Sequence, residues 1–278
     1  MLTYTVYSEA GGVGKTTFAA NLAVADANHG RDVLVVDLDP QEGSLSYLMD
    51  VADDRGDPEA DHLPRHLIDR PRGDFEGLIK QSEGVDIVPG HNQLENLSTL
   101  LNRRQREAED FGERFNPNKQ LLRVLRENDV QEKYDTVIVD PPATADHKLY
   151  NAIHATRNLL IPFEPSGKGQ QSVEGLEDLV IGLEENLSIN VGVLAVVPNE
   201  FKNTNDQQEM LEEIQQQGFD VPVVIGERKS LFEGCWRQQC SAYRYLEEHR
   251  DRERDYELET LEQIDQLAKH LRSTVEGT

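Results

Sequence analysis

Seven short aliphatic runs alternate with longer helix-like stretches along this chain of 278 residues. Most of the runs are nearly continuous in Val, Ile and Leu, which is typical of strands that are buried on both faces. Strands that alternate with helices predict a parallel sheet with helices on both sides. The seven predicted strands are 3–8, 32–38, 85–89, 135–140, 159–163, 191–197 and 221–225.

Helical patterns fill the intervals between these strands. They predict helices over 16–28, 93–104, 119–128, 147–155, 172–185, 206–217 and 256–272. The predicted fold is therefore a doubly wound α/β fold with a mostly parallel sheet, in one domain over residues 1–278. Residues 50–75, rich in Asp, Arg, Pro and Gly, interrupt the pattern and predict an exposed insertion with one short helix at most. The tract 247–257 mixes charges of both signs and predicts a solvated helix with i,i+4 ion pairs.

A glycine-rich turn lies between the first predicted strand and the first predicted helix. Its sequence, GGVGKTT, comprises Gly11, Gly12, Val13, Gly14, Lys15, Thr16 and Thr17. In this setting the backbone N–H groups and the helix N-terminus form a site for anions, and glycine lets the backbone approach a phosphate closely. Lys15 can reach the β- and γ-phosphates of a nucleotide, and the Thr16 hydroxyl can bind Mg²⁺. The strict P-loop pattern requires glycine where this chain has Glu9, so the prediction depends on the GGVGKTT core and its position.

Three acidic residues follow two of the predicted strands. Asp37 and Asp39 end the run VLVVDLDPQ (33–41), and Asp140 ends YDTVIVDPP (134–142). Ligands of open α/β sheets bind at the carboxyl ends of the strands. Because an acid at this position commonly holds Mg²⁺ through water, the three residues predict a magnesium site beside the phosphates.

Three motifs of this chain, in their order, resemble the ParA/Soj branch of the deviant Walker ATPases, in the ParA–MinD superfamily. They are GGVGKTT, VLVVDLDPQ and YDTVIVDPP. The resemblance continues through residues 158–180 and 191–201. It implies ATP and Mg²⁺ as cofactors and a homodimer that forms face to face around two nucleotides. It also implies nonspecific DNA binding and ATP hydrolysis that a ParB-like partner protein stimulates.

The resemblance also assigns roles to single residues of this chain. Lys15 matches the phosphate-binding lysine, and Asp39 matches the acid that positions the attacking water. The residues that match the surroundings of the metal are Thr16, Asp37 and Asp140. Asn199, just after the run VGVLAVV, matches a position that reads adenine in related ATPases, although an asparagine after a strand is commonly a turn residue.

One position departs from the family pattern. The family has a lysine that reaches across the dimer to the partner's phosphates, and this chain has Ala10 there. Phosphoryl transfer requires positive charge near the transferred group. Lys168, in a loop flanked by glycines, is the predicted substitute, and an ordinary exposed lysine is the alternative. Late basic residues in places comparable to the family's DNA-binding surface are Lys202, Arg228 and Lys229.

The chain is strongly acidic, with 28 basic against 52 acidic residues and a net charge of −24. Such a surface repels nucleic acid unless basic groups cluster, and contacts to phosphate weaken steeply with salt. DNA binding is therefore the least secure of the implied properties. The same composition suggests adaptation to high salt, as in a halophile. With neither a signal peptide nor a long apolar run, we expect a cytoplasmic protein.

Three other classes share features with this sequence. A MinD-like positioning ATPase would need a C-terminal amphipathic helix with a basic face, and the apolar stripe of the 256–272 helix is flanked mainly by acids, which favours a core-packing helix. An iron–sulfur carrier would need bridging cysteines, and Cys235 and Cys240 are more typical of free structural thiols. A biosynthetic enzyme built on the same P-loop fold stays open, because a fold does not determine function.

Overall fold

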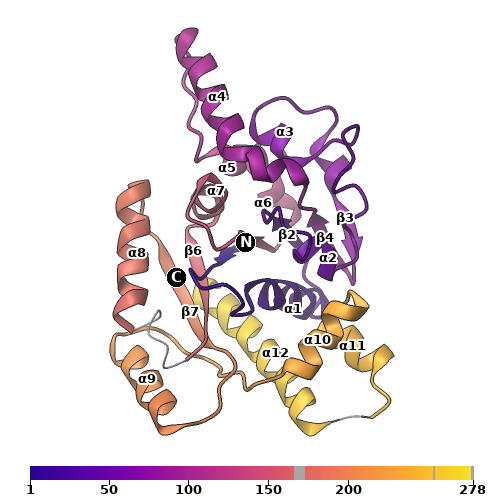
Figure 1. Cartoon of the computed structure of the whole chain (residues 1–278), viewed down its shortest axis with the longest axis vertical. Helices are drawn as coiled ribbons and strands as arrows, with labels where there is room; N and C mark the ends of the chain where they lie inside the picture. Colours follow the sequence, from indigo (N-terminus) through magenta and orange to yellow (C-terminus); the bar gives the residue numbers. More distant parts are fainter. Residues whose placement is uncertain (166–172, 253, 277–278) are drawn as a thin grey trace.

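A seven-stranded sheet forms the centre of the computed structural model, which describes residues 1–165, 173–252 and 254–276 (Figure 1). The strands lie in the order β3-β4-β2-β5-β1-β6-β7, and all neighbours are parallel except β3 and β4. The predicted doubly wound α/β fold is confirmed. The strands are β1 Leu2–Val6, β2 Val33–Asp37, β3 Lys80–Ser82, β4 Val85–Val88, β5 Thr136–Asp140, β6 Asn158–Phe163 and β7 Gly192–Pro198.

The register of the sheet brings the acidic strand ends together. Asp37 at the end of β2 pairs directly with Asp140 at the end of β5. On the other side of β5 lies β1, which leads into the glycine-rich turn. Because the three strands are parallel, the turn and both acids lie at the same edge of the sheet, where ligand sites of this fold occur.

Helices cover both faces of the sheet (Figure 1). Alternate side chains of β2 enter different clusters, with Val33 and Val35 packed on one side and Leu34 and Val36 on the other. The first side carries α1 Lys15–Asn28, α2 Leu45–Leu48, α10 Lys229–Gln238, α11 Ala242–His249 and α12 Asp255–Glu276. The remaining helices are α3 Leu63–Leu67, α4 Leu97–Asp110, α5 Gln120–Glu127, α6 Val130–Lys133, α7 His147–Thr156, α8 Val173–Leu187 and α9 Asn205–Gln216, with the 3₁₀ turns η1 Phe75–Leu78 and η2 Asn92–Asn96.

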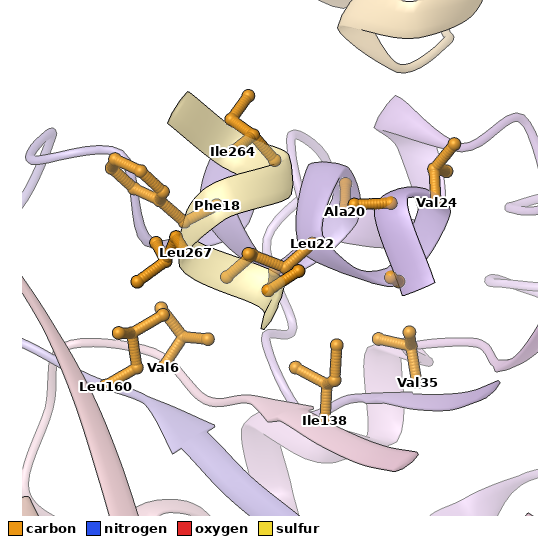
Figure 2. Close-up of a cluster of buried hydrophobic side chains, with 14 of the residues drawn as sticks. Val6, Phe18, Ala20, Leu22, Val24, Val35, Ile138, Leu160, Ile264 and Leu267 are labelled. Atoms are coloured by element: carbon orange, nitrogen blue, oxygen red, sulfur yellow. The ribbon is translucent and has the colours of Figure 1, made fainter. Parts of the chain in front are cut away.

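The helix that follows the glycine-rich turn, α1, packs on the sheet beside α12, which also contacts β1 and β7. Every residue from Phe18 to Asp26 is buried. Figure 2 shows Phe18 and Leu22 of α1 beside Leu267 of α12, above Val6 of the sheet. Arg272 of α12 forms an ion pair with the buried carboxylate of Asp26, which also accepts a hydrogen bond from Thr136 Oγ1 at 3.0 Å. The C-terminal helix is therefore part of the core.

The apolar stripe of α12 bears out the core-packing interpretation over an amphipathic membrane helix. Ile264, Leu267 and Leu271 are buried in the cluster around α1. Only the first member of the stripe, Leu258, is exposed, at 38%. Within the described residues, no helix is long and apolar enough to cross a membrane.

The predicted strand at 221–225 is wrong. This segment runs beside the end of β7, and its region forms a single parallel bridge, between Phe201 and Gly226. Val223 and Ile225 are nevertheless buried in the core. Pro222 supplies no N–H group for a ladder, so the aliphatic run records burial rather than strand pairing. The antiparallel edge strand β3 is short and polar, with no pattern to predict it, and helices α10 and α11 were also not predicted.

Two segments differ from their predicted exposure. In 50–75, residues 53–59 are mostly exposed, but Leu63, Leu67 and Phe75 are buried in the cluster on the α5 side of the sheet. The tract 247–257 is not a solvated helix, because α11 ends at His249 and α12 begins at Asp255. Glu257 is fully buried and pairs with Arg250. The sequence predicted surface ion pairs in this tract, whereas the pair between Arg250 and Glu257 is part of the packing between α11 and α12.

Candidate functional site

The glycine-rich turn connects the end of β1 to Lys15, the first residue of α1. Gly12 and Gly14 have φ values of +79° and +96°, in the left-handed region that favours glycine. A Cβ on Gly14 would also lie 2.9 Å from Nδ2 of Asn199. Gly14 precedes α1 with no capping side-chain hydrogen bond from the described residues. The N–H groups of the first helical turn and the helix dipole are therefore available to an anion.

Lys15 lies over this turn. Its Nζ donates a hydrogen bond to the carbonyl oxygen of Ala10 at 2.8 Å. Burial lowers the pKa of Lys15, and the carboxylates of Asp140 and Asp39 partly oppose this shift. A half-buried ammonium at this position can bind a phosphate group, and the two neighbouring carboxylates can bind a cation beside it.

Asp37 organises the loop that follows β2. Its Oδ1 accepts a hydrogen bond from the backbone N–H of Asp39 at 2.9 Å. Its Oδ2 accepts two from Ser46, from the backbone N–H at 2.9 Å and from Oγ at 2.5 Å. Ser46 Oγ in turn accepts from the N–H of Gly90 at 2.8 Å. Burial raises the pKa of Asp37, and the Ser46 hydrogen bonds oppose that shift.

Asp140 is in a different electrostatic situation. It is fully buried, and neither carboxylate oxygen has a hydrogen-bond partner of normal geometry among the described residues. Burial and then the Asp37 carboxylate raise the pKa of Asp140 well above its usual value, while Thr16 and Lys15 oppose the shift. A buried carboxylate is costly unless a cation pairs with it. Oxygen ligands from Asp140 and Thr16 fit Mg²⁺, which prefers hard oxygen donors and keeps several waters.

Asp39 lines a cavity of about 340 Å³ at the same edge of the sheet. Lys15, Thr16 and Pro142 also line this cavity. Asp39 is half-buried, and its Oδ1 accepts a hydrogen bond from the N–H of Gln41 at 2.9 Å. Its carboxylate is thus close to the phosphate-binding lysine but outside the buried pair formed by Asp37 and Asp140.

A second cavity, of about 290 Å³, lies on the other side of the glycine-rich turn. Its apolar wall comes from three helices and the segment before α10, and consists of Phe18, Ile225, Phe232, Trp236 and Ile264. Two buried asparagines, Asn21 and Asn199, also line this cavity. Nδ2 of Asn199 donates a hydrogen bond to the carbonyl oxygen of Val13 at 3.1 Å. Asn199 Oδ1 has no partner within the described part of the chain. An aromatic base with an amino group fits such a cavity.

The AAA-domain family matches residues 1–191, which is more than half of the chain. The chain belongs to the AAA-domain family. An uncharacterized protein of Methanocaldococcus jannaschii is 30% identical over 233 residues, covering 81% of this chain and 83% of its own. The chromosome-partitioning ATPase Soj of Thermus thermophilus is 30% identical over 195 residues, covering 68% of this chain and 67% of its own. The resemblance to ParA/Soj-type ATPases predicted from the three motifs is confirmed.

A solved structure extends the similarity to the whole fold. The ATP complex of a McdA variant from Cyanothece superposes with a TM-score of 0.71 at 20% identity, covering 99% of this chain and 96% of that protein. At this identity the comparison supports the fold alone.

The predicted DNA-binding cations of this AAA-domain protein are all paired with acids. Lys202 and Lys229 both lie by Glu227, at 3.6 and 3.0 Å. Arg228 is held more firmly, since its Nε donates to the Tyr256 carbonyl oxygen at 3.0 Å and its guanidinium lies over the Tyr256 ring. Lys168, the predicted substitute for the signature lysine, lies outside the described residues.

Cys235 and Cys240 are free and buried, as predicted for structural thiols. Burial raises the pKa of both thiols, that of Cys240 to about 11. The described residues contain no cluster of His, Cys, Asp and Glu able to hold a metal on its own.

Sequence reasoning missed several residues that shape the site. Ser46 and Gly90 fix Asp37 and the loop after it, and a Cβ on Gly90 would lie 2.9 Å from the Asp39 carbonyl oxygen. Trp236 lines both cavities and stacks on Tyr47, with 6.3 Å between the ring centroids. A signal that could have been found in the sequence is Ser46, the second serine after DLDPQ, because its hydroxyl can donate to a buried acid at the end of the preceding strand.

Proposed function

We propose that this protein is a ParA/Soj-type ATPase that binds and hydrolyses ATP with Mg²⁺ in a nucleotide-dependent homodimer and thereby segregates or positions plasmid or chromosomal DNA. The observation that carries the proposal is the fully buried Asp140 carboxylate, which has no hydrogen-bond partner of normal geometry among the described residues. It lies in register with Asp37 and beside Lys15 and Thr16. Such a group is stabilised when a cation arrives together with a phosphate.

The residues of the site divide the chemical work. The turn from Gly11 to Gly14 and the ammonium of Lys15 bind the phosphates. Thr16 and Asp140 would hold Mg²⁺, which offsets the negative charge of the phosphates when bound. Asp39 orients the attacking water. The cavity beside Asn199 takes the adenine, whose amino group donates to Oδ1.

The positive charge that the family places in trans is missing at Ala10. Lys168 stays the proposed replacement, acting across the dimer. The alternative is that hydrolysis is slow and depends on a stimulating partner, since a cation at the transferring phosphoryl group contributes orders of magnitude to the rate. Lys168→Ala separates the two, because only the first reading expects the variant to lose dimerisation or hydrolysis.

Cargo and partner are proposed from the relatives. The Soj protein named above is a chromosome-partitioning ATPase. A ParB-like partner and nonspecific DNA are the corresponding partners here, in the cytoplasm. Because Lys202 and Lys229 already lie beside Glu227, we expect DNA binding to be weak and to depend on dimerisation, which doubles the number of cations. A MinD-like positioning role without a basic amphipathic helix and a P-loop biosynthetic enzyme are the remaining alternatives.

Light scattering tests the proposal directly. The molar mass of the wild type and of Asp39→Ala is measured with ATP, with ADP and without nucleotide, in molar KCl, alongside hydrolysis of ATP. We expect ATP to produce a dimer that Asp39→Ala retains, because ATP binds but is turned over much more slowly. A Lys15→Ala variant, which loses the phosphate contact, should stay monomeric. A wild type that is monomeric in every state and hydrolyses no ATP would contradict the proposal and favour the biosynthetic alternative.

A further inference from the structure

The loop that carries Asp39 is held from two directions. From β4 comes Gly90, whose backbone lies so close that an added Cβ would be 2.9 Å from the Asp39 carbonyl oxygen. From the segment between α2 and α3 comes Arg55, which donates through Nη2 to the carbonyl oxygen of Pro40. Beyond this point the loop is open to solvent, since Gln41, Glu42 and Gly43 are exposed. The peptide of Pro40 is thus the last firmly held point before the exposed part of the loop.

Arg55 is itself firmly anchored. Its carbonyl oxygen accepts a hydrogen bond from the N–H of Asn92 at 3.1 Å, and its own N–H donates to Ala52 at 3.1 Å. The side chain is only 15% exposed. Arg55 has little freedom to move, because its backbone N–H and carbonyl are both hydrogen-bonded and its side chain is mostly buried. Its guanidinium can therefore fix the position of the Pro40 carbonyl oxygen.

The contacts of the Arg55 side chain contribute little to the stability of the fold. Its Nε is buried without a partner among the described residues, which costs free energy. The one carboxylate near it, on Glu42, is 3.9 Å from Nη1 and 94% exposed, so this ion pair contributes little. The main polar contact of the side chain is the hydrogen bond from Nη2 to the Pro40 carbonyl oxygen. Because the donor is charged, this hydrogen bond is stronger than one between neutral groups. A cost in folding free energy at one residue that its own contacts do not offset is typical of residues retained for function.

We propose that Arg55 is a positioning residue for ATP hydrolysis, which holds the Pro40 carbonyl so that the neighbouring Asp39 carboxylate stays oriented toward the attacking water. The inference rests on the proposed ATPase function. Arg55 touches neither nucleotide nor water in this assignment, and it acts only through the backbone that it shares with Asp39. It also gives a functional role to a residue of the 50–75 segment.

The test compares kcat and KM for ATP in the wild type, Arg55→Met and Arg55→Lys. A methionine keeps much of the packing volume but cannot donate to Pro40. Since a misplacement of about 1 Å can cost about a hundredfold in rate, we expect kcat of Arg55→Met to fall about 10- to 100-fold while KM stays within about twofold. Arg55→Lys should recover part of the rate, because an ammonium can still donate one hydrogen bond. It also decides the question if Arg55→Met fails to fold.

A double-variant cycle distinguishes positioning from general destabilisation. In an Asp39→Ala background, Arg55→Met should leave the residual single-turnover rate unchanged, because the residue that Arg55 positions is already removed. Arg104→Met is the matched control, since Arg104 is 21% exposed, pairs with Asp69 at 3.8 Å and lies on the opposite side of the sheet from α1.

Three results would overturn the inference. The first is a kcat of Arg55→Met, or of a folded Arg55→Lys when the methionine variant is unfolded, equal to that of the Arg104→Met control. The second is an equal further loss in the Asp39→Ala background. The third is a wild type that hydrolyses no ATP, which overturns the proposed function as well and so is distinguishable from the other two.

Discussion

Asn199 gives the proposed base cavity a hydrogen-bonding direction that can be measured. Its Nδ2 donates to the carbonyl oxygen of Val13 at 3.1 Å, and a carbonyl can only accept, so the amide orientation is fixed. Oδ1 is therefore the atom left for a ligand, and it has no partner among the described residues. The side chain is 6% exposed, so water cannot readily replace that partner.

The size of the effect follows from this geometry. The amino group of adenine can donate to Oδ1, whereas guanine presents a carbonyl oxygen at the corresponding position. A buried acceptor left without a donor costs about 1–3 kcal/mol. This corresponds to a preference for ATP over GTP of about 5- to 150-fold from this one contact. Asn199→Ala removes the acceptor, so ATP binding should weaken by that factor while GTP binding stays the same or improves.

Isothermal titration calorimetry of the wild type and Asn199→Ala with ATP and GTP, both with Mg²⁺, measures the four dissociation constants. Affinity for GTP serves as the internal control, because both nucleotides place the same phosphates against Lys15. An unchanged ratio of ATP to GTP affinity in Asn199→Ala would refute the assignment of this cavity to the base. A parallel loss for both nucleotides would show that Asn199 acts only by shaping the glycine-rich turn.

Three further predictions concern the same edge of the sheet. Without Mg²⁺, Asp140→Asn should be more stable than the wild type, and the difference in stability should grow as the pH rises. Burial raises the pKa of Asp140 in the native state, so above the usual carboxyl pKa the native carboxyl keeps its proton while the unfolded chain has lost its proton. Rising pH therefore favours the unfolded state of the wild type but not that of the variant. Urea unfolding from about pH 4 to 8 checks this, and a pH-independent difference would contradict it. Gly90→Ala should reduce ATP hydrolysis about a hundredfold by displacing Asp39, with MgADP binding nearly unchanged in calorimetry, and an unaffected kcat would argue against close support of the loop. Trp236 is the only tryptophan and lines both cavities, so its fluorescence should change on addition of ATP, and Lys15→Ala should show no change at the same concentration.

The sequence was sufficient for the parts of the fold that repeat a simple pattern. Near-continuous aliphatic runs predicted six of the parallel strands, and the ends of two of them placed Asp37 and Asp140 at one edge. The run at 221–225 has the same composition, but Pro222 and its place beyond the end of β7 limit it to one bridge. Aliphatic side chains favour burial whether or not their segment is a strand. Strand pairing also requires a neighbouring strand with an unpaired edge.

The site followed the same division. GGVGKTT predicted the glycine-rich turn between β1 and α1, because the residues that determine this turn are consecutive in the chain. The support of Asp39 was not predictable, because Arg55 and Gly90 reach it from segments 15 or more residues away, and neither has a sequence pattern of its own. Glu257 shows the same limit, since nothing in EEHRDRERDYE distinguishes a buried, paired acid from an exposed one.

Because α1 packs on the sheet side by side with α12, the folding unit extends beyond the residues of the family match. The AAA-domain match ends at residue 191, yet Ile264, Leu267 and Leu271 complete the cluster that buries the phosphate-binding helix. A fragment ending at 191 would expose one whole side of α1 to water, together with the carboxylate of Asp26 that Arg272 now neutralises. The proposed nucleotide site at the first turn of α1 is thus connected through the core to the last helix of the chain. A partner or truncation that loosens the C-terminal helix would therefore act on the proposed site without contacting it.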